Sequence, residues 1–212
     1  METTNNITVL SSFIQAWTNE KNSPEIFPYE TDLITEIRNH INTQQQIIDK
    51  NLEQIKEEET NNNDSQLMFL TNIMLMEVER LNYLLRSYLR MRLDKIEKYP
   101  VYILKNQQVR ESLSKEEQQF LAGYFKLFEK HMKNSFLEKL PKPLQKIDDE
   151  EEGMVAKPDV NNYVACKINE DLGEVQFLEA DTFNLTLKKD DSYIINYDHI
   201  KPFIQSNKVS LI

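Results

Sequence analysis

The sequence predicts an α+β protein, with a mainly α-helical N-terminal bundle around a long central helix and a small β-rich domain at the C-terminus. Three observations support this fold class. Apolar residues recur at three- and four-residue steps through 67–99, a stretch without Gly or Pro. An unbroken acidic run occupies 148–152, and beyond 158 the apolar period shortens toward that of a strand. We therefore expect a helical domain at 1–147, an acidic linker at 148–158 and a β-rich domain at 159–212.

Two shorter helices are expected before the central one. The stretch from Ile7 to Lys21 places its apolar residues on one face, which predicts a short amphipathic helix carrying the single tryptophan, Trp17. A large aromatic side chain on such a face is either core or an interface anchor. Two prolines within 22–28 predict a turn, and apolar spacing predicts a second helix over 29–55.

The central helix is expected to run from Leu67 to Tyr99 and to stop at Pro100, with Asn63 or Asp64 capping its start. At 1.5 Å per residue such a helix is about 50 Å long, whereas a compact body of ~150 residues is roughly 40 Å across. A helix as long as its own domain has apolar surface that its own chain does not cover. The central helix is therefore expected to contact another chain.

Cations gather in the second half of the central helix, where they suit the helix dipole. One interpretation is a solvated face, on which Arg90 and Asp94 stand i,i+4 and can pair. The other is that Arg80, Arg90 and Arg92 fork onto carboxylates of another chain, because a guanidinium suits buried, bidentate pairing better than an ammonium.

A short helical extension or turn is expected over 101–109, followed by a further helix. Ser114 and Glu117 form a capping box that opens this helix. Its apolar stripe is rich in aromatic residues, and we interpret the stripe as core. The acidic run from Asp148 to Glu152 reads as a solvated linker, because consecutive carboxylates lack the alternating spacing of a calcium loop.

The C-terminal part is predicted to contain short strands at 163–168, 174–179, 183–188 and 192–197, with turns at Gly173 and at 190–191. A helical turn at 199–206 and a last strand at 209–212 follow. A domain of about 55 residues is marginal by itself. The chain also ends on apolar residues, so we expect Leu211 and Ile212 to dock against their own strands or another subunit.

Composition argues against several classes of protein. The net charge of −10 at pH 7 opposes a whole-surface attraction to nucleic acid or to an anionic membrane. A single cysteine, Cys166, excludes an internal disulfide framework and a multi-cysteine zinc site. No apolar run approaches ~20 residues and no signal peptide is visible, so we expect an intracellular, reducing location without a membrane partner.

No catalytic motif is recognisable in the sequence. The glycines at 123, 153 and 173 are isolated, so they cannot build a phosphate- or dinucleotide-binding turn. None of the three histidines has a His or Cys partner at metal-ligand spacing. We expect no catalytic, metal or cofactor site, and no enzyme. A nucleic-acid-binding adaptor that uses the basic half of the central helix is the alternative, although no aromatic-basic pattern of a single-strand platform accompanies it.

Several stretches together resemble one known family. The central helix carries Met76-Glu77-Val78-Glu79-Arg80, Tyr83, Ser87-Tyr88-Leu89-Arg90-Met91-Arg92-Leu93 and Lys95-Ile96-Glu97-Lys98. Further matching stretches are Ala16-Trp17, Asn19-Glu20-Lys21, Pro24-Glu25, Leu144-Gln145-Lys146, Asp148, Lys157-Pro158-Asp159, Tyr163-Val164, Ile200, Pro202, Ile204, Ser206, Val209, Leu211 and Ile212. In this order, over almost the whole chain, they resemble the Sld-five subunit family of the eukaryotic GINS complex.

The resemblance implies a helical A domain followed by a β-rich B domain, no catalytic activity, and a nuclear four-subunit assembly with Psf-one, Psf-two and Psf-three. It further implies that this tetramer joins the MCM ring and the Cdc-forty-five protein in the replicative helicase. It also implies that the tetramer helps to place the leading-strand polymerase and that the chain meets DNA only through the complex. The expected subunit-interface residues are Trp17, Arg80, Tyr83, Tyr88, Arg90, Arg92, Phe203, Leu211 and Ile212.

Overall fold

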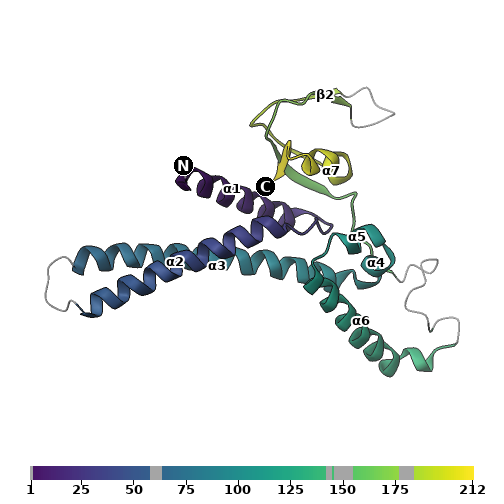
Figure 1. Ribbon diagram of the computed structural model, residues 1–212. Helices are drawn as coiled ribbons and strands as arrows, with labels where there is room; N and C mark the ends of the chain where they lie inside the picture. Colours follow the sequence, from purple (N-terminus) through teal and green to yellow (C-terminus); the bar gives the residue numbers. More distant parts are fainter. Residues whose placement is uncertain (1, 58–63, 142–144, 146–154, 177–183) are drawn as a thin grey trace. The chain divides into compact units, whose positions relative to one another are not determined.

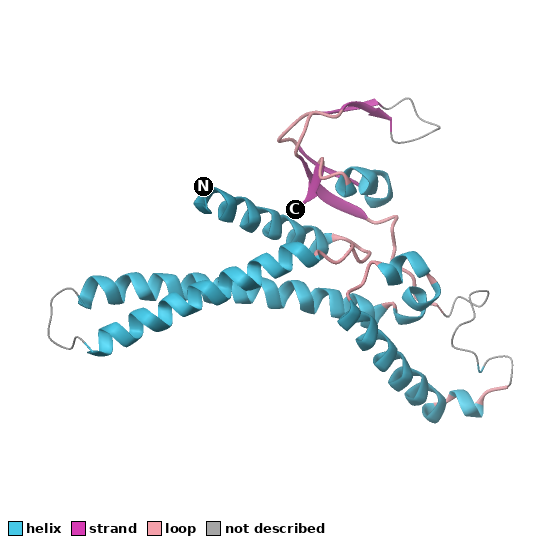
Figure 2. Cartoon of the chain, in the orientation of Figure 1, coloured by secondary structure: helices cyan, strands magenta, loops and turns pink. Residues whose placement is uncertain are grey.

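A computed structural model describes residues 2–57, 64–141, 145, 155–176 and 184–212. The chain forms two compact units: Met1–Trp17 with Glu30–Arg90, and Thr18–Tyr29 with Met91–Ile212. The predicted fold class is confirmed, since the N-terminal part is helical and the strands lie in the C-terminal part (Figure 2). The predicted division at 147 and 158 stays a prediction, because residues 146–154 lie outside the described ones.

The first unit is helical (Figure 1). It contains the N-terminal part of α1 (Glu2–Asn22), α2 (Thr31–Glu57) and most of α3 (Asp64–Lys98). α2 and α3 lie side by side, and Asn51 Nδ2 donates to Thr71 Oγ1 at 3.3 Å. The buried apolar residues of this unit are Phe13, Ile34, Ile37, Ile41, Ile48, Val78, Leu81, Leu84, Leu85 and Tyr88. Their three- and four-residue spacing is that of one face of each helix, as the sequence predicts.

The long central helix is confirmed as α3, which is 35 residues long. The next helix, α4 (Pro100–Lys105), begins at the predicted stop. Proline suits this first position because its missing N–H would find no intrahelical partner there. The predicted cap of α3 is not tested, because Asn63 and the side chain of Asp64 lie outside the described residues.

The helical part of the second unit has a small apolar core of Ile96, Ile103, Leu113 and Leu121. The elements around this core are the end of α3, α4, α5 (Gln107–Glu111) and α6 (Lys115–Ser135), and a 3-10 turn, η1 (Leu137–Lys139), follows α6. The short extension that the sequence predicts after Pro100 is therefore a pair of helices, α4 and α5.

The start of α6 confirms the predicted capping box. Glu117 N donates to Ser114 Oγ at 3.2 Å, and Ser114 N donates to Glu117 Oε2 at 2.9 Å. These two bonds satisfy backbone N–H groups that a helix start otherwise leaves without a partner. The glutamate is also buried, which gives it a second role in the structure described below.

The interpretation of the α6 stripe as core is confirmed for Leu121 and Leu137 and is wrong for Leu127 and Phe136. Leu121 is buried, but Leu127 is 70% exposed and Phe136 is also exposed. The partly exposed rings of Phe120, Tyr124 and Phe128 stack on each other, with centroids 6.0 and 6.3 Å apart. An i,i+4 spacing brings successive rings together whether or not another element covers them, so the pattern alone could not distinguish a buried from an exposed stripe.

The C-terminal part of the second unit is an antiparallel sheet of order β4–β1–β5, packed against a helix (Figure 2). Its elements are β1 (Tyr163–Ile168), β4 (Ser192–Asn196), α7 (Tyr197–Gln205) and β5 (Val209–Leu211). The core consists of Cys166, Ile168, Leu187, Ile195, Tyr197, Ile200, Ile204, Val209 and Leu211. The helix starts two residues before the predicted turn, because the Asn196 side chain caps it by accepting from Asp198 N at 3.1 Å.

A separate two-stranded ribbon joins β2 (Gly173–Gln176) to β3 (Asn184–Leu187). Gly173 has a φ of 71°, a left-handed conformation that glycine adopts without a steric cost, and it lies at the predicted turn. Asp190 has a similar φ of 68° at the other predicted turn. The strands predicted over 174–179 and 183–188 are found in part, because residues 177–183 lie outside the described ones.

Candidate subunit interface

The first half of α3 carries several exposed apolar side chains close together in sequence. Phe69 is 68% exposed and Met76 is 70% exposed, and the further exposed members are Met68, Leu70, Ile73 and Leu75. The part of α3 that follows, up to Arg90, has a buried apolar face, because Val78, Leu81 and Leu85 are buried there. Soluble monomers rarely expose a large contiguous apolar patch unless a partner covers it. This surface, residues 68–76 of α3, is the strongest candidate for an interface.

Four predicted interface residues lie on or next to residues 80–90 of α3. Trp17 is half-buried, and its Nε1 donates to Ser87 Oγ at 3.1 Å. Tyr83 is 66% exposed, and Arg80 and Arg90 are exposed as well. These positions remain accessible to a partner, so their predicted role stays a prediction.

Arg80 differs from Arg90 in having a partner within its own helix. Its Nη2 and Nε donate to the Glu77 carboxylate at 2.6 and 2.9 Å. This pairing lowers the pKa of Glu77 and raises the pKa of Arg80. Within the described part of the chain, no ion pair or hydrogen bond forms to the Arg90 guanidinium, and the predicted pair with Asp94 is absent. Arg80 is therefore partly neutralised, whereas Arg90 offers its charge to solvent or to a partner.

Tyr88 and Arg92 must be removed from the predicted surface of α3. Tyr88 is buried and packs against Phe13, with ring centroids 5.9 Å apart. Arg92 is 0% exposed. Its carboxylate partners belong to its own chain, so the expectation that the α3 arginines pair with carboxylates of another chain is wrong for Arg92.

Arg92 lies at the centre of a buried ion network in the second unit. Its Nε and Nη2 donate to the two carboxylate oxygens of Glu117 at 2.7 and 3.0 Å. Its Nη1 donates to Glu20 Oε2 at 3.1 Å and to Phe27 O at 2.7 Å, and its guanidinium lies 5.3 Å from the Tyr29 ring centroid. Bidentate pairing of this kind compensates a charge that water cannot reach.

Lys95 extends the network by one turn of α3. Its ammonium donates to Glu20 Oε1 at 2.7 Å, to Ser23 Oγ at 2.8 Å, and to the backbone oxygens of Glu20 and Glu25 at 2.5 and 2.8 Å. Burial lowers the pKa of Lys95, while the Glu20 carboxylate opposes this shift. The two cations of α3 thus fix the end of α1 and the turn that follows it.

Glu25 connects this turn to the C-terminal sheet. Its Oε1 accepts from Tyr197 Oη at 2.8 Å and its Oε2 accepts from Lys201 Nζ at 2.9 Å. Nearby, Asn19 Oδ1 accepts from Leu211 N at 2.8 Å, and the Phe27 side chain packs against the sheet core. The 18–29 segment therefore anchors both α7 and the last strand.

The predicted interface residues at the C-terminus are only partly available to another subunit. Leu211 is buried among its own strands, and Phe203 is half-buried against the same core. Ile212 N donates to Ala165 O at 3.0 Å, but its side chain is 56% exposed. The Leu211 side chain and the Ile212 backbone therefore dock against strands of their own chain, which is one of the two expected alternatives.

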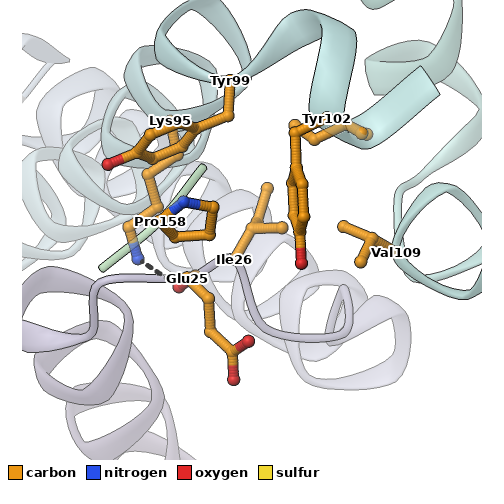
Figure 3. A pocket seen from close by; sticks show the side chains of 8 residues that line it. Glu25, Ile26, Lys95, Tyr99, Tyr102, Val109 and Pro158 are labelled. Carbon is orange, nitrogen blue, oxygen red and sulfur yellow. Dashed lines mark hydrogen bonds between the residues drawn. The ribbon is translucent and has the colours of Figure 1, made fainter. Parts of the chain in front are cut away.

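A small cavity next to Lys95 has room for about one water molecule. Its volume is about 20 Å³, and its lining residues are Glu25, Ile26, Lys95, Tyr99, Tyr102, Ile103, Val109 and Pro158. Figure 3 shows Lys95 reaching the backbone of Glu25, whose carboxylate points away from the cavity. Ligand pockets are at least ten times larger. We therefore assign this cavity to the packing of the 18–29 segment and not to a substrate site.

Possible metal ligands and the Cys166 thiol are the remaining groups to consider among the described residues. Among the described residues, no cluster of three or more His, Cys, Asp or Glu side chains could hold a metal ion. Burial raises the pKa of the Cys166 thiol, which disfavours the reactive thiolate. Within the same residues, no helix has the length and apolar character needed to cross a bilayer.

Two family models match this chain. The GINS complex protein helical bundle domain matches residues 46–136, and the DNA replication complex GINS protein SLD5 C-terminus matches residues 158–212. Among full-length relatives, the Dictyostelium discoideum DNA replication complex GINS protein SLD5 is 32% identical, over 99% of this chain and 95% of that protein. The chain belongs to the SLD5 family of GINS complex proteins.

Other SLD5 proteins support the same assignment. The Schizosaccharomyces pombe relative is 30% identical over 92% of this chain and 88% of its own length. The Homo sapiens relative is 32% identical over 93% of this chain and 86% of its own length. The SLD5 helical model begins at residue 46. Asn19, Glu20 and Glu25, which anchor the C-terminal sheet, lie before residue 46, so the match to this family model does not include them.

Substitution of Arg92 by Met should destabilise the protein strongly. It would leave the Glu117 carboxylate buried without its cation and would leave Glu20 with Lys95 as its remaining cationic partner, a loss of ~3–5 kcal/mol in the free energy of unfolding. Arg80→Met, which breaks an exposed pair, should cost about 1 kcal/mol or less. Urea unfolding followed by circular dichroism compares the two variants. Equal losses would contradict the assignment of Arg92 as the buried centre of the network.

The contribution of Tyr197 to stability should decline at alkaline pH. Burial and the adjacent Glu25 carboxylate raise the pKa of Tyr197, so the folded state keeps a proton that the unfolded state releases above about pH 10. The difference in unfolding free energy between the native chain and Tyr197→Phe should therefore fall by about 1.4 kcal/mol between about pH 9 and about pH 11. The exposed Tyr163, changed to Phe, serves as control. A pH-independent difference for Tyr197→Phe would contradict the buried pairing.

Proposed function

We propose that this chain is a non-catalytic structural subunit of a heterotetrameric GINS complex that acts in DNA replication. Its sister subunits would be Psf-one, Psf-two and Psf-three. The observation that carries the proposal is the exposed apolar surface at 68–76 of α3, in a chain that belongs to the SLD5 family. Burial of that surface against sister helices would supply the free energy of assembly.

The division of residues along α3 supports a role in assembly. Charged groups of α3 occupy the interior of the second unit, whereas large apolar groups of α3 face solvent in the first. Burying a Phe or Met side chain contributes about 1.5–3 kcal/mol. A chain that leaves several such groups exposed is stabilised and solubilised by a partner that covers them.

The proposed wider role rests on membership of the SLD5 family. In the assembled state the tetramer would join the MCM ring and the Cdc-forty-five protein in the replicative helicase and would help to place the leading-strand polymerase. The chain would act in the nucleus and would meet DNA only through the complex. SLD5 family membership supports these proposals, and the structure adds a candidate surface for the first step, tetramer formation.

The alternative of a nucleic-acid-binding adaptor loses much of its basis in the structure. Arg92 and Lys95, two of the cations expected on the basic half of α3, are engaged with Glu20 in the interior. Arg80 is paired with Glu77. The cationic surface that remains is small for a chain with a net charge of −10.

Changing Phe69 and Met76 to Ser should impair assembly with little effect on the fold. Co-expression with the three sister subunits, one of them tagged, measures how much of this chain is retained. Loss of two buried apolar contacts should weaken retention by about a hundredfold or more. The matched control is Gln46→Ser with Lys50→Ser, two exposed polar residues of α2.

The same experiment tests the proposed function itself. The native chain should be poorly soluble alone and soluble in the co-expressed complex. A native chain that is monomeric, well behaved and not retained by its sister subunits would refute the proposal. Binding of DNA by the isolated chain, with a steep dependence on salt, would favour the adaptor instead.

A further inference from the structure

A hollow of about 490 Å³ lies on the surface of α3 in the first unit. Its lining residues are Glu79, Tyr83, Arg86, Ser87 and Arg90. Positions separated by three and four residues share one side of a helix, so these side chains form a single stripe. The carboxylate of Glu79 stands at one end and the two guanidinium groups stand toward the other. The hollow is thus a cationic surface with an exposed tyrosine at its middle.

The two arginines of this hollow are not neutralised by their own chain. Within the described ranges, Arg86 and Arg90 form no ion pair or hydrogen bond through their guanidinium groups. Arg80 lies six residues before Arg86 on α3 and is paired with Glu77 at 2.6 Å. Arginine side chains on one helix therefore fall into two classes, and those in the hollow keep their planar forks available for a carboxylate.

A fixed hydroxyl group lies between the two arginines. Ser87 Oγ accepts from Trp17 Nε1 at 3.1 Å, which orients the hydroxyl group. A serine hydroxyl that accepts one hydrogen bond keeps its own proton for donation to a second acceptor. Together with the guanidinium groups and the Tyr83 ring, this donor completes a surface suited to carboxylate oxygens beside an apolar contact.

We propose that this hollow binds a segment of a sister GINS subunit that carries two carboxylate side chains opposite Arg86 and Arg90 and an apolar group against Tyr83. The inference rests on the proposed function and names the chemistry of one contact within it. This contact is distinct from the apolar surface at 68–76. That surface contributes buried apolar area but does not distinguish an acidic partner from a basic one. The hollow selects the partner and its register, because a neutral or basic segment would leave the two cations uncompensated.

Charge complementarity favours this occupant over a second copy of the chain. A copy offers one carboxylate in the hollow, Glu79, for two arginines, so pairing of two hollows would leave one arginine unmatched on each side. Nucleic acid is disfavoured too, because Glu79 and the net charge of −10 repel a polyanion. A segment with two carboxylates matches the cations of the hollow and leaves Glu79 at its rim in solvent.

The test measures binding of this chain to the assembled other three subunits. Arg86→Glu with Arg90→Glu should weaken that affinity about tenfold or more and should flatten its dependence on salt, because attraction of exposed charges is screened by ions. The matched control, Arg38→Glu with Lys50→Glu, makes the same change of net charge on exposed residues of α2 and should leave the affinity within about twofold.

A photo-crosslinking amino acid at position 83 identifies the occupant. The expected product joins this position to a sister-subunit peptide with two Asp or Glu residues close to the crosslink. A crosslink to a peptide without them, to a second copy, to the acidic run at 148–152 or to added DNA would overturn the proposal, as would unchanged affinity of the double variant. Failure of the native chain to bind its sisters would refute the proposed function instead.

Discussion

The second unit depends on one guanidinium group that has no access to water. An uncompensated charge in the interior costs several kcal/mol, so the carboxylates of Glu20 and Glu117 have to reach Arg92. One carboxylate comes from the end of α1 and the other from the first turn of α6. Arg92 therefore fixes how three helices meet. Glu117 serves twice, because it also closes the capping box of α6.

The position of the C-terminal sheet follows from this cluster. Glu20 binds both Arg92 and Lys95, and Lys95 in turn holds the backbone of Glu25. The Glu25 carboxylate is then directed toward Tyr197 and Lys201 of α7. A domain too small to bury much of its own surface gains a rigid support in this way. The apolar surface of α3 at 68–76 plays no part in this chain of contacts and stays available for assembly.

The sequence was sufficient for the fold but not for the buried network. Apolar periodicity, the proline at the end of α3 and the capping box are local signals, and each located an element. The partners of Arg92 are 72 and 25 residues away, and no local pattern records such a pairing. Arg90 and Arg92 are two positions apart, which places them about 200° apart around the helix. Which of the two faces inward is decided by where α1 and α6 pack, and sequence spacing does not give that information.

The hydrogen bond from Leu211 to Asn19 closes a loop of 192 residues. Asn19 is synthesised early and Leu211 late, and at 5–20 residues per second roughly 10 to 40 s separate them. Until the last strand leaves the ribosome, the 18–29 segment lacks the contacts that it makes with α7 and β5. Nascent chains should therefore pass through a stage in which the end of α1 is incompletely held. Emergence of β5 from the ribosome, and not the formation of any helix, is then the step that completes these contacts.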